Sequence, residues 1–240
     1  MSMKPWKEGA GFVYPPASVR GRRLKIMGTG ESLGGAFETV GIMGEGIVHG
    51  DLQAEEFKAM GSCRVNGSAD LRKGRIQGEL TVEGSLRAEV FKGLGQLMVR
   101  DGIAAGRLKV QGHLESGASC EVDEAELSGG FRIGGLLSAD RLDINLYAPC
   151  QAKEIGCDRI EVKRSRIMDL KRRFTSTGPS VLKAELIEGD ELRLSYTEAA
   201  VVRGNRVMIG PGCVIGRVEY AQTLEKSPGA FVGSEIKLGS

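Results

Sequence analysis

Two histidines are the side chains of this 240-residue sequence best suited to proton transfer. His49 and His113 fall at outward positions of the repeat described below, about four coils apart, or roughly 18 Å at ~4.8 Å per coil. A shared metal ion or a proton relay needs the two rings much closer than this. We therefore expect both histidines to face solvent without a catalytic role.

Five cysteines are the other candidates for chemistry. Cys63, Cys120 and Cys150 fall at inward positions of different coils, where a thiol behaves as a small apolar group. Cys157 and Cys213 have no partner at the spacing of metal ligands, because no Cys-x-x-Cys motif occurs. We predict no metal site and no cofactor. Free thiols are also typical of a cytoplasmic protein.

One stretch carries an enzymatic resemblance. Residues 209–216, Ile-Gly-Pro-Gly-Cys-Val-Ile-Gly, resemble the hexapeptide repeat of left-handed β-helix acyltransferases. The match spans barely two hexapeptides, and those enzymes need a general base, usually a histidine. Both histidines lie far upstream. We expect no enzyme, and an acyltransferase is the least favoured alternative.

The elements that would position any site come from a repeat of 17 residues between Val40 and Cys150. Glycine recurs in one register, at Gly44, Gly61, Gly78, Gly95, Gly112 and Gly129. Apolar residues recur in other columns of the same register. A fixed period of this size indicates stacked structural repeats.

Within one repeat, apolar or small residues alternate with polar ones, which predicts β-strand with one buried face. The inward set is predicted to be Val40, Ile42, Gly44, Gly46, Val48, Gly50, Leu52 and Ala54. The odd period requires one slip in the alternation, expected between Ala54 and Phe57, and small residues near Gly44 and Gly50 are expected at corners. Each coil should bury about six apolar side chains.

A coil of 17 residues has a perimeter of roughly 55 Å at ~3.3 Å per residue, which suits three short sides. Such coils stack at ~4.8 Å and share backbone hydrogen bonds. The sequence therefore predicts an all-β, parallel β-helix (β-solenoid), three-sided, with about 17 residues per coil. Right-handed crossover is the general preference for parallel strands, so we expect a right-handed coil.

The period divides the chain into five segments. Residues 1–23 are predicted to form a flexible arm, with a membrane-surface anchor as the alternative, and residues 24–163 carry the main repeats, beginning with a coil one residue short. Residues 164–181 break the pattern. Residues 182–225 resume it at a spacing near 15, as further coils of the same solenoid or as a second one. Residues 226–240 form a last strand or cap.

Two clusters of cations are candidate contact sites. One is a ladder of outward residues in successive coils, Lys58, Arg75, Lys92 and Lys109, beside outward Met43, Met60 and Leu94. It would attract phosphates or an acidic partner unless Glu79 and Glu83 neutralise it. The other is the basic loop or insertion at 164–181, either a solvated insertion or a contact for lipid head groups or a partner. Its cations are Arg164, Arg166, Lys171, Arg172 and Arg173.

The overall charge balance points away from nucleic acid as a partner. Lys plus Arg number 33 against 31 Asp plus Glu, so no overall field attracts a polyanion. The sequence has no run of ~18 apolar residues and no signal-peptide core. We expect a cytoplasmic protein of bacterial type.

Several stretches between residues 24 and 225 resemble the bactofilins, a family of bacterial polymer-forming cytoskeletal proteins. The resemblance rests on residues 34–37 (Gly-Gly-Ala-Phe), 42–46 (Ile-Met-Gly-Glu-Gly), 48–52 (Val-His-Gly-Asp-Leu), 201–204 (Val-Val-Arg-Gly), 209–213 and 218–220 (Val-Glu-Tyr). It implies a right-handed, three-sided β-helix that polymerises end to end without nucleotide. It also implies a scaffold for client proteins, often at the inner face of the membrane.

The two ends of a solenoid leave unpaired strand groups above apolar side chains, and neither terminus offers a capping helix. We expect self-association through Leu24 and Ile26 at one end and through Phe231 and Val232 at the other. The sequence thus predicts a structural, self-assembling scaffold. The main alternative is a β-helix that binds partner proteins without polymerising, as the C-terminal domain of the bacterial septum inhibitor does.

Overall fold

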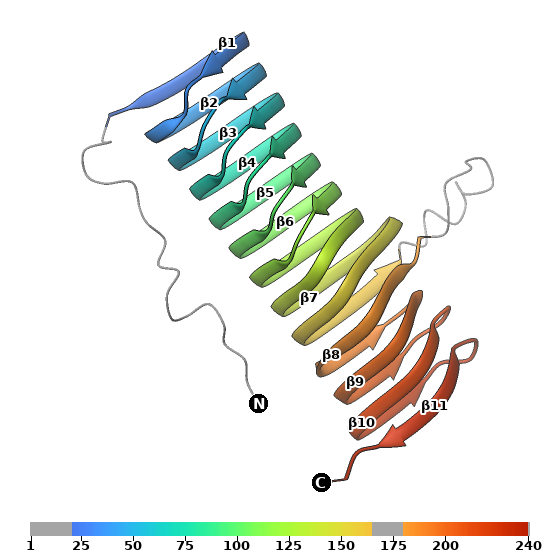
Figure 1. Cartoon of the computed structure of the whole chain (residues 1–240). Helices are drawn as coiled ribbons and strands as arrows, with labels where there is room; N and C mark the ends of the chain where they lie inside the picture. Colours follow the sequence, from blue (N-terminus) through green and yellow to red (C-terminus); the bar gives the residue numbers. More distant parts are fainter. Residues whose placement is uncertain (1–20, 165–179, 240) are drawn as a thin grey trace, which may run out of the picture.

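The chain folds into one long parallel β-solenoid of about 12 turns (Figure 1). This computed structural model describes residues 21–164 and 180–239. Eleven strands form one sheet in which every strand pairs in parallel with the next in the chain. They are β1 (Arg23–Ser32), β2 (Gly35–Val48), β3 (Leu52–Val65), β4 (Ala69–Val82), β5 (Leu86–Val99), β6 (Ile103–Ser116), β7 (Cys120–Arg164), β8 (Leu182–Leu194), β9 (Thr197–Ile209), β10 (Val214–Lys226) and β11 (Phe231–Lys237).

One coil around β3 shows how the sequence makes three sides. Buried side chains come in three pairs, and the two members of each pair are separated by one outward residue. The residues between one pair and the next turn the three corners. The pairs are Leu52 with Ala54, Phe57 with Ala59, and Cys63 with Val65. The three-sided coil and its six inward apolar residues were predicted, and both are confirmed.

The glycine column lies at one of these corners. Gly61 and Gly78 have φ values of +115° and +125°, a backbone conformation that side chains with a Cβ rarely adopt. A Cβ on Gly78 would also overlap the carbonyl oxygen of Gly61 in the coil before it. The predicted corner position of Gly44 is confirmed. The predicted slip in the alternation between Ala54 and Phe57 is also confirmed, because only this corner has two residues while the other two have three. Gly44, which the alternation placed inward, lies instead at a corner and does not face the core.

The C-terminal coils are shorter. Leu182 pairs with Thr197 and Leu194 with Ile209, so β8 and β9 are offset by 15 residues, as predicted. Their sides keep three residues each, and the five corners from β8 to the end of β9 have two residues each, whereas the corner after β9, at residues 210–212, has three. In the coil of β3, the corners have two, three and three residues, so the shorter period removes one residue from each of two corners.

The whole described chain is one solenoid. Cys150 in β7 pairs with Leu182 in β8 across the stretch at 165–179, and the pairing runs on to Glu161 with Arg193. The first coil is one residue short, as predicted, because Ile26 pairs with Ile42. The core is a single column of buried residues along the axis. The described residues contain no helix that could cross a membrane.

Candidate binding face

The basic ladder lies on one side of the solenoid, on the strand segment that precedes the glycine corner. Lys58 pairs in register with Arg75, Arg75 with Lys92, and Lys92 with Lys109. In parallel strands, residues in register stand one above the other at ~4.8 Å. The four cations therefore form the vertical row that the sequence predicted.

A second column runs beside this row, two residues earlier in each strand, and three of its six residues are cations. Across β1 to β6 the two columns hold eight cations and one acid, Glu56, a net charge of +7. We call these residues the basic face. Its cations are Arg23, Lys25, Lys58, Lys73, Arg75, Lys92, Arg107 and Lys109.

Acids pair with three cations of the basic face. Lys58 binds Glu56 of its own strand at 3.1 Å, Arg107 binds Glu124 at 2.9 Å, and Lys109 binds Glu126 in the next coil. Within the described residues, neither Arg75 nor Lys92 has an ion-pair partner within 4 Å. Further acids stand at the bordering corners rather than on the face itself. They are Glu38, Glu55 and Glu89 on one side and Glu45 and Glu79 on the other.

The expected neutralisation by Glu83 does not occur. Glu83 accepts instead from Arg64 at 3.2 Å and from Arg100 at 3.0 Å, on another side of the coil. That part of the prediction is wrong, because Glu83 lies beyond the glycine corner, where its carboxylate faces a different set of cations.

An exposed apolar column lies beside the cations, one residue before the glycine corner. Met27 is 63% exposed, Met43 53%, Met60 50% and Leu94 53%. Gln77 separates Met60 from Leu94 in this column, because Met60 pairs with Gln77 and Gln77 with Leu94. The predicted outward direction of the methionines and Leu94 is confirmed.

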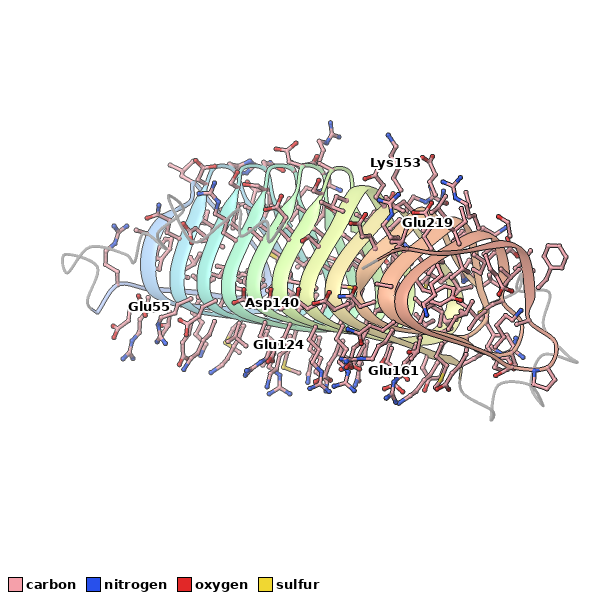
Figure 2. All side chains as sticks on the ribbon, turned by 90° about the horizontal axis from the view of Figure 1, so that it is seen from below. Glu55, Glu124, Asp140, Lys153, Glu161 and Glu219 are labelled. Carbon is pink, nitrogen blue, oxygen red and sulfur yellow. The ribbon has the colours of Figure 1, made fainter. Side chains whose placement is uncertain are left out.

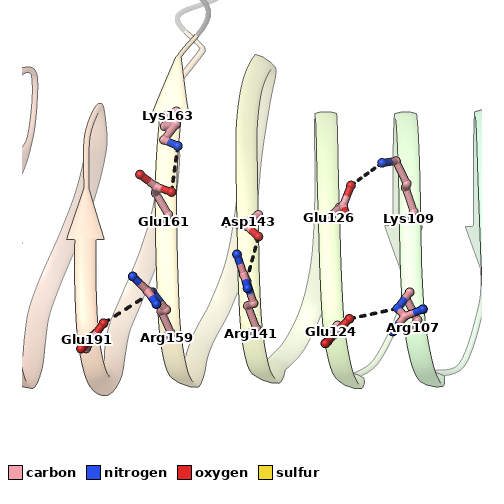
Figure 3. Close-up of polar contacts among 10 residues, drawn as sticks. All are labelled: Arg107, Lys109, Glu124, Glu126, Arg141, Asp143, Arg159, Glu161, Lys163 and Glu191. Atoms are coloured by element: carbon pink, nitrogen blue, oxygen red, sulfur yellow. Dashed lines mark hydrogen bonds and ion pairs between the residues drawn. The ribbon is translucent and has the colours of Figure 1, made fainter.

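The same side changes character at the border of β6 and β7, and ion pairs neutralise its charges from there onward (Figure 3). Arg107 donates to Glu124 at 2.9 Å, Arg141 pairs with Asp143 at 3.2 Å, and Arg159 with Glu191 at 3.4 Å. Lys163 pairs with Glu161 at 2.8 Å. Figure 2 shows that Glu55, Glu124 and Glu161 lie along one edge of the rod, with Lys153 and Glu219 at the opposite edge.

The thiols are all buried and free. Burial raises the pKa of Cys63, Cys120, Cys150 and Cys157 to about 12, so these thiols stay protonated and unreactive at neutral pH. Burial also raises the pKa of Cys213. The three inward positions predicted from the repeat are confirmed, and Cys157 and Cys213 prove to be inward as well.

The histidines lie apart on the outer surface, as predicted. His49 Nε2 is 2.9 Å from Glu31, and His113 Nε2 is 3.9 Å from Glu115. No group of three or more His, Cys, Asp or Glu side chains in the described chain is arranged to hold a metal ion.

Sequence comparison provides a family. The chain is 44% identical over 235 residues to the uncharacterized protein YhbE of Bacillus subtilis (strain 168), a match that covers 90% of this chain and 98% of YhbE. The chain belongs to the YhbE family. The uncharacterized protein YhbF of the same organism is 40% identical over 105 residues, 43% of this chain and 42% of YhbF. No family model matches the sequence. No solved structure matches it either.

The ends of this YhbE-family solenoid differ from each other. Leu24 and Ile26 occupy inward columns of β1, because they pair with Val40 and Ile42. At the other end Val232 lies over buried Ile215, whereas Phe231 pairs with exposed Val214. Phe231, 62% exposed, thus lies on the flank of the last coil rather than over its axis.

The sequence did not reveal a charge at the C-terminal end. Glu235 pairs in register with buried Val218, so it stands in an inward column, and its carboxylate binds Lys226. Four cations of the basic face were also missed. Lys25 lies in the column of the ladder itself, and Arg23, Lys73 and Arg107 lie in the column two residues before it.

The basic loop lies largely outside the described residues, including Arg166, Lys171, Arg172 and Arg173. The guanidinium carbon of Arg164 lies 3.7 Å from the centre of the Tyr196 ring. Tyr196 in turn packs against the corner at residues 210–212, where a Cβ on Gly212 would come within 2.5 Å of its ring. The acyltransferase-like stretch in this YhbE-family chain thus marks a solenoid corner.

Proposed function

We propose that this YhbE-family chain is a structural scaffold of the bactofilin kind that associates end to end without nucleotide, in the cytoplasm at the inner face of the membrane. The observation that carries the proposal is the open sheet at both ends of the described chain. There, β1 pairs only with β2, and β11 pairs only with β10. Unpaired strand edges are templates for pairing with a further strand.

The body of the solenoid suits a scaffold. Its sides present stacked side chains at ~4.8 Å intervals, so a client protein could bind at any level that offers the right side chains. Client binding and self-association then use different surfaces, the sides for clients and the ends for further copies.

One observation favours a second candidate, a β-helix module that binds partners without polymerising. Glu235 places a carboxylate in the inward column above Val218 at the C-terminal end. Burying this charge in an axial contact is costly unless Lys226 or another cation stays with it.

Size-exclusion chromatography with light scattering, at rising protein concentration, tests the proposal. We expect the mass to increase with concentration and to be indifferent to ATP and GTP. Val232→Arg should reduce association because it adds a charge to an inward column, whereas Phe231→Arg changes only the flank and serves as its matched control. Leu24→Arg tests the other end.

A strict monomer at high micromolar concentration would overturn self-assembly and favour the binding module. A stronger loss with Phe231→Arg than with Val232→Arg would show that copies associate side by side rather than end to end. Circular dichroism of each variant separates lost association from lost folding.

A further inference from the structure

We propose that the basic face of β1 to β6 docks flat on an anionic lipid bilayer. Six strands at ~4.8 Å spacing make a flat strip roughly 24 Å long, on which cations and apolar side chains share one plane. The strip combines the two features that hold a protein on an anionic surface, namely positive charge and exposed apolar side chains.

The charge on the strip is left available for an external anion. Arg75 and Lys92 stand in register at the centre of the basic face, and no acid in the described chain pairs with either. Like charges in directly opposite positions destabilise a sheet. An anionic surface that neutralises both would relieve this repulsion.

The methionine column favours lipid over an acidic protein or a nucleic acid. Met43 and Met60 are half exposed in consecutive coils, and Leu94 stands two coils further along. Flexible apolar side chains beside cations can enter the region between head groups and acyl chains while the cations bind phosphates. No aromatic side chain occupies an outward position of this strip, so base stacking has no platform.

The remainder of this side provides an internal contrast. From Glu124 onward its cations pair with acids of the same or the next coil, as at Arg141 with Asp143 (Figure 3). A surface neutralised in this way offers little net attraction to an anionic membrane. The proposed contact therefore ends where β7 begins.

The main test is flotation of the full chain with vesicles of phosphatidylglycerol and phosphatidylcholine. We expect binding at low salt that weakens as salt screens the charges, and none to pure phosphatidylcholine. Substitution of Lys58, Arg75 and Lys92 by Gln should weaken binding at least tenfold. A control variant with Arg87, Arg132 and Lys153 changed to Gln removes the same charge from other sides and should stay within twofold of wild type.

A second variant separates lipid from soluble anions. Met43, Met60 and Leu94 are changed to Gln, the residue that the same column already carries at Gln77. Charge is unchanged, so binding to heparin should persist while binding to vesicles falls severalfold. If this variant binds both heparin and vesicles as well as wild type does, the lipid assignment is overturned in favour of a soluble polyanion or an acidic protein.

The depth to which the basic face enters the bilayer is measured with a polarity-sensitive dye attached to the cysteine of Met60→Cys. Because the native thiols of the described chain are buried, the introduced exposed thiol can be labelled selectively. We expect a blue shift of the dye with anionic vesicles and no shift for a dye on Lys153→Cys. Equal shifts at both positions would contradict docking through this face.

Two further outcomes would reject the proposal. The first is a wild-type chain that does not float even at low salt. The second is binding that is kept in the basic-face variant and lost when the cations of the basic loop are changed to Ser, namely Arg164, Arg166, Lys171, Arg172 and Arg173. Light scattering of the same variants without vesicles keeps this result distinct from self-association, which the basic-face substitutions should leave intact.

Discussion

The coils before β7 and those after it solve the same geometric problem in two ways. In the 17-residue coils a glycine such as Gly78, with φ of +125°, turns one corner and lies against the carbonyl of the glycine in the coil before. The 15-residue coil from Leu182 to Tyr196 turns three corners of two residues, and of these corner residues only Tyr196 has a positive φ, at 52°. The repeated glycine is therefore a requirement of one corner type and disappears with it.

The two regions also differ in how they handle charge. On one side of β1 to β6 cations stand above cations, whereas further along Arg203 lies between Glu188 at 3.1 Å and Glu219 at 2.6 Å. Cross-coil ion pairs therefore support the short coils, whose corners lack the stacked glycines. The long coils combine stacked glycine corners with a charged face whose central cations, Arg75 and Lys92, have no ion-pair partner among the described residues.

Gly78→Val should break the long coils, with the largest effect of the three changes considered. Its side chain would overlap the Gly61 carbonyl at a φ that valine avoids, so two coils must shift, and we expect a loss of ~3 kcal/mol or more. Thermal and urea unfolding measure this.

Two controls accompany Gly78→Val. Gly93→Ala lies in the same stack, but its new methyl meets Ile76 at an ordinary 3.4 Å, so stability should change little or rise. Asn205→Ala tests a two-residue corner and should cost less than ~0.5 kcal/mol. A tolerated Gly78→Val would contradict the role given to the glycine corner.

Glu219→Gln should weaken the short coils to an intermediate extent. The hydrogen bond from Arg203, with a further contribution from Arg217, holds the pKa of this carboxyl below its ordinary value of 4.5. Since the folded-state pKa is depressed, the stabilisation is present above pH 4.5 and is lost as pH falls through the folded value.

The melting temperature as a function of pH tests this. Wild type and Glu219→Gln should differ most above pH 5 and converge in acid. Glu225→Gln, an exposed change in the same strand, is the matched control and should follow wild type. A constant difference between Glu219→Gln and wild type at all pH values would point to packing rather than to the ion pair.

Arg75→Glu should change stability least of the three substitutions, and it should stabilise the protein where the other two destabilise it. It places an acid between Lys58 and Lys92 and so gives the basic face the pattern of the neutralised half, which should stabilise by ~0.2–1 kcal/mol. Arg193→Glu, beside Glu161 in the neutralised half, should destabilise by a similar amount. Both substitutions are measured by urea unfolding. If both stabilise or both destabilise the protein, the charge contrast between the two halves does not affect stability.

Much of the fold could be predicted because stacked coils place like residues in register. The Gly44 column and the inward pairs such as Leu52 with Ala54 gave the period, the three sides and the core. The inward direction of Gly44 was wrongly predicted, because a glycine at an inward step of the alternation satisfies the same binary pattern as a corner glycine. Only its backbone angle distinguishes a corner from a core position.

The sequence predicted where the cations of the candidate site lie, but not which acids they pair with. Register alone stacks Lys58, Arg75, Lys92 and Lys109. The choice of acid depends on how side chains lean, since Lys58 binds Glu56 in its own strand while Lys109 binds Glu126 one coil on. Glu235 was missed because the offset between successive coils changes from 16 residues between β9 and the first half of β10 to 17 between β10 and β11, so no single period assigns it to a column.

The junction of β7 and β8 is a place where a reporter can be inserted at a known height along the solenoid. Cys150 to Glu161 pair with Leu182 to Arg193 although a long stretch of chain intervenes, so extra sequence there leaves the ladder of backbone hydrogen bonds in step. A fluorescent domain inserted between residues 170 and 171 should report one fixed height along the axis. The distance between this domain and a dye at either end of a neighbouring copy would then show whether copies join head to head or head to tail.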